Sequence, residues 1–105
     1  MRINLSPMRM DATLSVIRSG NAIVVNGEEF DFSRVAEGDT LPSVAIKSTW
    51  FAGDVSRVDG ELELTLILPL PINYSPEQAF PSPLEDVRDG PIPLPMPLPE
   101  PGEQA

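Results

Sequence analysis

The side chains available for chemistry are limited, because the 105 residues include neither histidine nor cysteine. These two residue types supply many of the general bases and nucleophiles of enzymes. Cysteine is also a ligand in most structural zinc sites. The remaining candidates are carboxylates, hydroxyls and arginines, with one lysine, Lys47, and one tyrosine, Tyr74. We therefore expect a protein that is not an enzyme and that holds no metal and no cofactor.

Two groups of carboxylates are the strongest candidates for catalysis or metal binding. Glu61 and Glu63 could serve as a glycosidase pair, but a spacing of two places them together on the wet face of a strand, where they keep a sheet soluble. Glu28, Glu29 and Asp31 lack the Asp-x-Asp-x-Asp-Gly spacing and the distal glutamate of an EF-hand loop. Neither group predicts a catalytic or metal site.

The most regular stretch of the sequence is residues 61–68, where leucine occupies every second position. This alternation predicts a β-strand with one buried face and one wet face. The preceding Asp59-Gly60 pair is typical of a type I′ turn, because both central residues of that turn need a positive φ. We expect a hairpin here, with Val55 and the leucines on its buried face.

A second hairpin is predicted around Asn26-Gly27, the strongest turn dipeptide in the chain. The geometry of a two-residue loop pairs Val25 with Glu28 and Ile23 with Phe30. An earlier strand would complete a three-stranded antiparallel meander. The strands of this meander are expected at residues 11–18, 22–25 and 28–32, with a three-residue turn at 19–21.

The other segments of the first 68 residues show weaker patterns. Residues 3–5 predict a short edge strand that Ser6-Pro7 ends, because proline cannot donate a backbone hydrogen bond. Residues 33–42 predict a loop or a short helical turn, and residues 44–51 predict a further strand. The expected fold is all-β, a small antiparallel meander or sandwich-like domain of six or seven short strands with an extended proline-rich C-terminal tail.

Trp50 and Phe51 are the most conspicuous aromatic residues of the predicted strand at 44–51. Because they are neighbours, their side chains should point to opposite faces. We expect one of them to fill the core. The other could contact a partner, since aromatic side chains are enriched in interface hot spots. Both are therefore candidate partner-binding residues.

The composition changes near residue 68, because eleven of the 13 prolines lie in residues 69–105. Proline removes the donors that a central strand needs, so a packed sheet is not expected to continue there. The sequence predicts three segments. They are an antiparallel β domain at 1–68, a proline-containing linker with one short edge strand at 69–90, and an alternating-proline tail at 91–105.

The tail has proline at every second position from Pro91 to Pro101. Its apolar residues would share one face of an extended strand and turn their backbone groups toward one edge. Such a strand could add to the sheet of a neighbouring subunit or partner. A stiff, solvated spacer is the alternative, and SH3 or WW binding is disfavoured because strict alternation supplies no PxxP motif. The candidate partner-binding residues of the tail are Ile92, Leu94, Met96 and Leu98.

Charge and hydropathy narrow the classes of partner. A net charge of −9 opposes binding to a phosphate backbone, so nucleic acid is not an expected partner. The start of the chain lacks a signal-peptide core, and the longest apolar run is too short to span a membrane. We expect synthesis in the cytoplasm without membrane insertion. The small core favours a homo-oligomer or docking on a larger assembly.

Several short motifs form a familiar arrangement along most of the chain. They are Ile3-Asn4-Leu5-Ser6-Pro7, Met10-Asp11, Asn26-Gly27-Glu28, Phe30-Asp31-Phe32-Ser33, Trp50-Phe51-Ala52, Asp59-Gly60-Glu61-Leu62 and Asp89-Gly90-Pro91. The arrangement resembles small proteins encoded in the tail gene clusters of tailed bacteriophages and proteobacterial prophages. The motifs consist of turn and strand residues, so no residue takes a functional role from the resemblance.

What the resemblance implies is a virion structural protein of the distal tail, associated with the baseplate, the tail tip or the tail fibre. Its partners would be other phage tail, baseplate or fibre proteins, and its location would be the virion after synthesis in the host cytoplasm. The alternative is a non-virion chaperone or adaptor for tail-fibre assembly, which would bind the same partners transiently.

Overall fold

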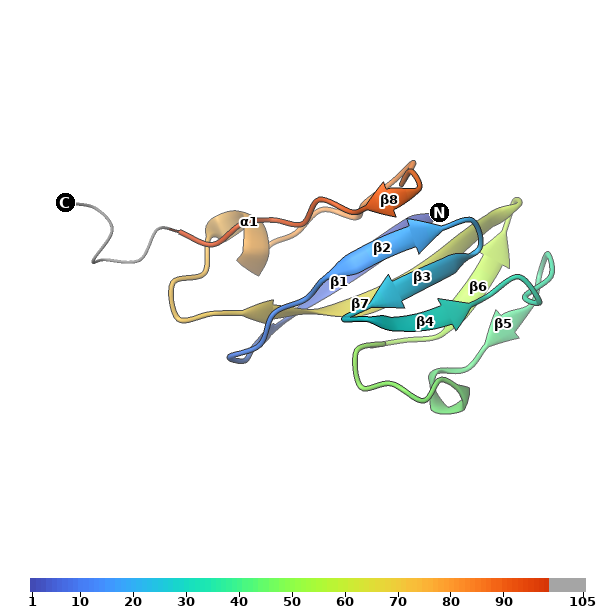
Figure 1. Cartoon of the computed structure of the whole chain (residues 1–105), viewed down its shortest axis with the longest axis horizontal. Helices are drawn as coiled ribbons and strands as arrows, with labels where there is room; N and C mark the ends of the chain where they lie inside the picture. The colour runs from blue at the N-terminus through green and yellow to red at the C-terminus, as the bar shows by residue number, and fades with distance from the viewer. Residues whose placement is uncertain (99–105) are drawn as a thin grey trace.

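A computed structural model of the chain describes residues 1–98. The chain folds into two four-stranded sheets that share one core, with strand orders β1-β7-β6-β5 and β4-β3-β2-β8 (Figure 1). The expectation of a small all-β, sandwich-like domain is confirmed. The elements are β1 (Arg2–Arg9), β2 (Val16–Ser19), β3 (Ala22–Val25), β4 (Glu28–Asp31), β5 (Thr40–Leu41), η1 (Ser43–Ala45), β6 (Val55–Val58), β7 (Glu61–Leu70), α1 (Pro76–Ala79) and β8 (Gly90–Pro91).

The leucine-rich strand β7 lies inside its sheet, between β1 and β6. Its leucines at positions 62, 64, 66 and 68 are all buried, and Glu61 is exposed, as the alternation predicts. The strand also continues through Pro69 to Leu70, beyond the expected end at Leu68. On β7, the odd-numbered residues bond toward the β6 side, where the Ile67 N–H donates to the Trp50 carbonyl oxygen at 2.8 Å. Pro69 lies two residues further along this side, past Trp50, where the described chain has no strand to pair with. The N–H that Pro69 lacks therefore costs no hydrogen bond of the sheet.

Both predicted type I′ turns are present. Asn26 and Gly27 have φ values of 49° and 86°, and Asp59 and Gly60 have values of 54° and 77°. The registers are also as predicted, with Val25 opposite Glu28 and Ile23 opposite Phe30. Positive φ at both central residues lets a two-residue loop follow the twist of its strands, so these dipeptides fix the pairing.

Replacing Gly60 with valine is expected to lower the free energy of unfolding by about 1–3 kcal/mol, because a β-branched residue resists positive φ. A Cβ at Gly60 would meet no atom within 4 Å, so the cost comes from the backbone alone. Urea denaturation measures it. The control is Gly53→Ala, at a glycine without positive φ whose added Cβ would lie 3.8 Å from Thr65. Equal losses in the two variants would contradict the prediction.

The expected short edge strand at the N-terminus is longer than predicted. β1 runs through Pro7 to Arg9 and pairs in parallel with β7 along its full length. Ile3 directs both its N–H and its carbonyl away from β7, toward Leu84, with distances of 2.9 and 2.8 Å. Pro7 has the same parity as Ile3, so its missing donor belongs to the outer edge and costs no bond to β7.

The predicted strand at residues 44–51 is wrong. The 3₁₀ turn η1 forms instead, and Val44 on it is 92% exposed. An Asp54 carboxylate oxygen accepts the Ser43 N–H at 2.8 Å and holds the start of η1. Only Phe51 pairs, through a single antiparallel bridge to Leu66. A carboxylate eleven residues away thus supports a turn where local propensity favours a strand.

The start of β2 and the length of the β2–β3 turn also differ from the prediction. β2 begins at Val16, so residues 11–15 precede the strand, although Leu14 and Val16 are both buried as expected. The turn between β2 and β3 has two residues, Gly20 and Asn21, because Ser19 pairs directly with Ala22. The segment at 33–42 forms turns and ends in the short strand β5.

The region expected to be a linker lies against the two sheets. Ser75 and Gln78 form a capping box at α1, in which each side chain accepts the other residue's backbone N–H, and both residues are buried. Within the edge strand expected at residues 83–88, only Leu84 forms a bridge, which is to Ile3. The short strand β8 follows and pairs with β2.

Candidate functional site

The aromatic pair separates as predicted into one core residue and one half-buried residue. Phe51 is buried, and its ring meets Phe30 edge-on at a centroid distance of 5.0 Å and Phe32 at 5.8 Å. It is therefore not accessible to a partner. Trp50 is half-buried and packs against the core, and part of its surface stays open.

The first part of the proline tail adds to a sheet of its own chain. Gly90 and Pro91 pair with Arg18 and Ile17, and the Ile92 N–H donates to the Val16 carbonyl oxygen at 2.9 Å. Ile92 is 8% exposed and belongs to the core cluster. Within the described tail only Pro91 belongs to a strand, which pairs with the chain's own β2, and Ile92 packs in the chain's own core.

The second part of the tail runs beside the segment before α1. The Leu98 N–H donates to the Asn73 carbonyl oxygen at 2.9 Å, and the Ser75 hydroxyl donates to the Met96 carbonyl oxygen at 2.6 Å. Leu94 is half-buried against the core, whereas Met96 and Leu98 are exposed. Of the four tail candidates, only Met96 and Leu98 are exposed, at 75% and 50%. The predictions for residues 99–105 of the tail lie outside the described residues.

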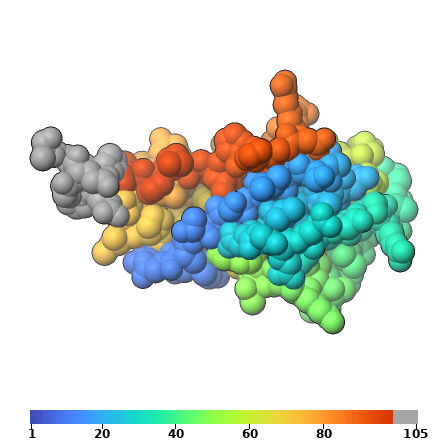
Figure 2. Space-filling view, in the orientation of Figure 1, coloured from blue at the N-terminus to red at the C-terminus, as the bar shows by residue number. Residues whose placement is uncertain are grey.

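The exposed apolar residues of the tail are part of a larger surface, which we name the apolar end. It lies at the end of the molecule that carries α1, where the tail and the chain after β7 run side by side (Figures 1 and 2). Ile72 and Phe80 are 84% and 83% exposed. We use this name for the exposed apolar residues of the two segments, which are Ile72, Tyr74 and Phe80 after β7 and Met96 and Leu98 on the tail.

A groove opens beside the apolar end, with a volume of about 350 Å³. One wall comes from the tail, and the others come from the end of β7, the segment before β2 and α1. Its lining includes Leu14, Leu68, Pro71, Gln78, Leu94 and Met96. The groove lining contains no charged residue, and Glu77 is the only charged residue within residues 68–84 and 91–98. Arg9 lies at the same end, where its guanidinium donates to the Leu70 carbonyl oxygen at 3.1 Å.

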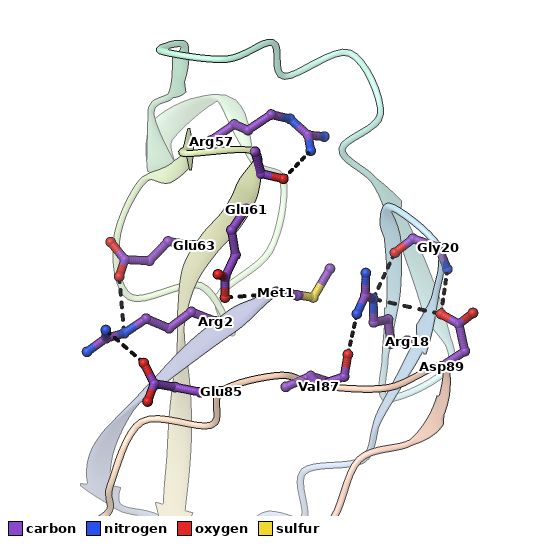
Figure 3. Close-up of polar contacts among 11 residues, drawn as sticks. Met1, Arg2, Arg18, Gly20, Arg57, Glu61, Glu63, Glu85, Val87 and Asp89 are labelled. Carbon is purple, nitrogen blue, oxygen red and sulfur yellow. Dashed lines mark hydrogen bonds and ion pairs between the residues drawn. The ribbon is translucent and has the colours of Figure 1, made fainter.

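Polar contacts at the opposite end of the sheets hold the segment that leads into the tail (Figure 3). Arg2 lies between two carboxylates, 3.3 Å from Glu63 and 3.1 Å from Glu85. Asp89 accepts the Gly20 N–H at 2.9 Å. These contacts join residues 85–89 to both sheets and position β8 for pairing with β2.

The carboxylates considered for catalysis lie on wet surfaces. Glu63 is paired with Arg2 and Glu61 lies 3.5 Å from the Met1 amino nitrogen. Asp31 accepts the Ser33 N–H at 2.9 Å, and this hydrogen bond lowers the pKa of the Asp31 carboxyl. Within residues 1–98, no three metal-ligating side chains lie close enough together to hold an ion.

Two arginines that the sequence analysis did not select, Arg18 and Arg57, line a second cavity of about 290 Å³. The alternation of side chains along the predicted strands indicates that both arginines face inward. Arg18 follows Leu14 and Val16 at a spacing of two, and the Asp59-Gly60 turn places Arg57 opposite Leu62. Both positions therefore face inward.

Neither helical segment in the described part of the chain is long enough to cross a bilayer. Comparison of the chain with protein-family models, with curated proteins and with solved structures found no match.

Proposed function

We propose that this protein is a structural component of the distal tail of a tailed bacteriophage, associated with the baseplate, tail tip or tail fibre, and that it binds a neighbouring tail protein through the apolar end. The observation that carries the binding role is the exposure of five large apolar side chains on two segments, residues 72–80 and 96–98, which hydrogen-bond to each other and contain one charged residue in a protein with a net charge of −9. The phage context rests on the resemblance of the sequence motifs.

The exposure of these side chains supports protein binding on energetic grounds. Burial of apolar surface contributes about 25 cal/mol per Å², and Phe and Tyr side chains are among the largest contributors. Contiguous apolar surface rimmed by polar residues commonly marks an interaction site. The absence of charge within residues 91–98 also means that a partner would not have to desolvate ions there.

The described part of the tail is well suited to hold this surface in a fixed geometry. Ile92 anchors the tail in the core, and the Asn73 and Ser75 contacts tie Leu98 and Met96 to the segment before α1. A surface ordered before binding loses less conformational entropy on association.

The test is incorporation into particles made from the genome that encodes the chain. Mass spectrometry of purified particles should detect the protein, and Phe80→Asp should reduce its amount at least about tenfold, because a charge at a buried hot spot costs more than 1.4 kcal/mol. The matched control is Val44→Asp, at a residue that is 92% exposed on η1, away from the apolar end. This control variant should be incorporated normally.

The outcomes separate the two roles considered from the sequence. If the protein is absent from purified particles but its loss prevents fibre attachment, the non-virion chaperone or adaptor is favoured. Equal incorporation of Phe80→Asp and the wild-type protein would show that another surface makes the contact.

A further inference from the structure

Two inward-facing arginines, one from each sheet, line one cavity at the end of the sandwich opposite the apolar end. Arg57 of β6 pairs with the buried Leu62, and Arg18 of β2 pairs with the buried Ile23. Side chains of directly paired residues share a face, so both arginines occupy core-facing positions. Figure 3 shows the two side chains projecting from different sheets, with the Arg18 guanidinium beside Gly20 of the β2–β3 turn.

Arg57 has only neutral hydrogen-bond partners among residues 1–98. Its Nε donates to the Val35 carbonyl oxygen at 2.6 Å, and its terminal nitrogens donate to Gly60 O at 3.4 Å and to Asn21 Oδ1 at 3.3 Å. None of the described ion pairs includes it. A guanidinium has five N–H donors, so two remain available.

Arg18 has little charge compensation. It donates to the carbonyl oxygens of Gly20, at 2.9 Å, and of Val87, and its only carboxylate neighbour among the described residues is Asp89 at 3.8 Å. Its side chain is 25% exposed. Partly buried cations that lack close counter-charges pay a desolvation cost, and two cations lining one cavity also repel each other.

We propose that this cavity binds a small oxyanion, a phosphate or carboxylate group, between Arg57 and Arg18. The volume of about 290 Å³ is large enough for such a group together with several waters, since one water occupies about 30 Å³. The guanidinium fork matches two oxygens of a carboxylate or phosphate. The anion supplies the charge compensation that the described residues of the chain do not give Arg57.

Two carboxylates on the cavity lining limit what binds there. Asp59 and Glu61 both line the cavity, and Glu61 lies 3.5 Å from the Met1 amino nitrogen. Asp59 has no ion-pair partner among the described residues and opposes an incoming anion. The site therefore selects a small group over an extended polyanion such as a nucleic acid.

The experiment is a titration of the whole protein with inorganic phosphate and, separately, with acetate, monitored by NMR of the arginine side-chain Nε–H groups at constant ionic strength set with sodium chloride. Saturable shifts are expected for Arg57 and Arg18. Arg57→Gln should weaken binding at least about tenfold, because charged hydrogen bonds are lost. The control Arg9→Gln removes the same charge at the other end of β1 and should leave the affinity unchanged.

A third variant tests the sign of the electrostatics. Asp59→Asn removes the opposing charge and keeps a residue that tolerates the positive φ of this turn, so binding should tighten about threefold. Stronger binding of phosphate would indicate a phosphate-bearing ligand, and stronger binding of acetate a carboxylate of a partner protein.

The proposal is overturned if neither anion gives saturable shifts, or if Arg57→Gln and Arg9→Gln bind equally. If Arg57→Gln does not fold, Arg18→Gln takes its place. A rise in melting temperature with phosphate, absent with sodium chloride at the same ionic strength, gives a second readout that needs no variant.

Discussion

Phe51→Ala is expected to lower the free energy of unfolding by about 3–5 kcal/mol, the range for removing a buried phenylalanine. The Phe51 ring fills the space between the sheets and meets Phe30 and Phe32 edge-on at 5.0 and 5.8 Å. Alanine would leave a cavity between these two rings and remove both aromatic contacts. Chemical denaturation monitored by Trp50 fluorescence measures the change.

The matched control for this prediction is Phe80→Ala. Phe80 is 83% exposed, so the same chemical change should alter the free energy of unfolding by less than about 0.5 kcal/mol. The pair of variants separates the role of a core aromatic from that of an exposed one at the apolar end. A loss below about 1 kcal/mol for Phe51→Ala would contradict the placement of its ring in the core.

The parts of the fold that could be predicted are those that local physics determines. Asn26-Gly27 and Asp59-Gly60 fix two hairpin registers because their backbone geometry admits few alternatives. The leucines of β7 identify the buried face because a shift of one residue would expose all of them. These two signals predict the pairing of β3 with β4 and of β6 with β7.

The parts that were missed depend on contacts between distant residues. The parallel pairing of β1 with β7 joins segments about sixty positions apart, and no turn motif in the sequence predicts it. Similarly, η1 stands where a strand is predicted, and the Asp54 carboxylate accepts the Ser43 N–H at its start. Both features involve contacts that local propensity does not contain.

The candidate site was predictable in part. The proline alternation indicated an extended segment whose alternate residues offer their backbone groups to one edge, and within the described residues 90–98 only Gly90 and Pro91 form a strand. It could not identify the acceptor, which is the chain's own β2. The inward positions of Arg18 and Arg57 follow from the alternation of side chains along β2 and β6, but the sequence does not show that the two side chains line one cavity.

The buried position of Ile92 leads to the second large effect. Ile92→Ala is expected to lower the free energy of unfolding by about 2–3 kcal/mol, near the low end of the range for isoleucine because the residue lies at the edge of the core. The matched control is Ile72→Ala. Ile72 is 84% exposed, so the same truncation there should change stability by less than about 0.5 kcal/mol.

Hydrogen exchange in the isolated protein tests the same placement at the backbone. The Ile92 amide should be protected, since its N–H donates to the Val16 carbonyl oxygen at 2.9 Å. If Ile92→Ala has no effect and this amide exchanges freely, the tail is a solvated spacer and Met96 and Leu98 lose the support that holds them at the apolar end. A destabilised Ile92→Ala with a protected wild-type amide would instead make the tail a structural strand of its own sheet, whose exposed end remains available to a partner.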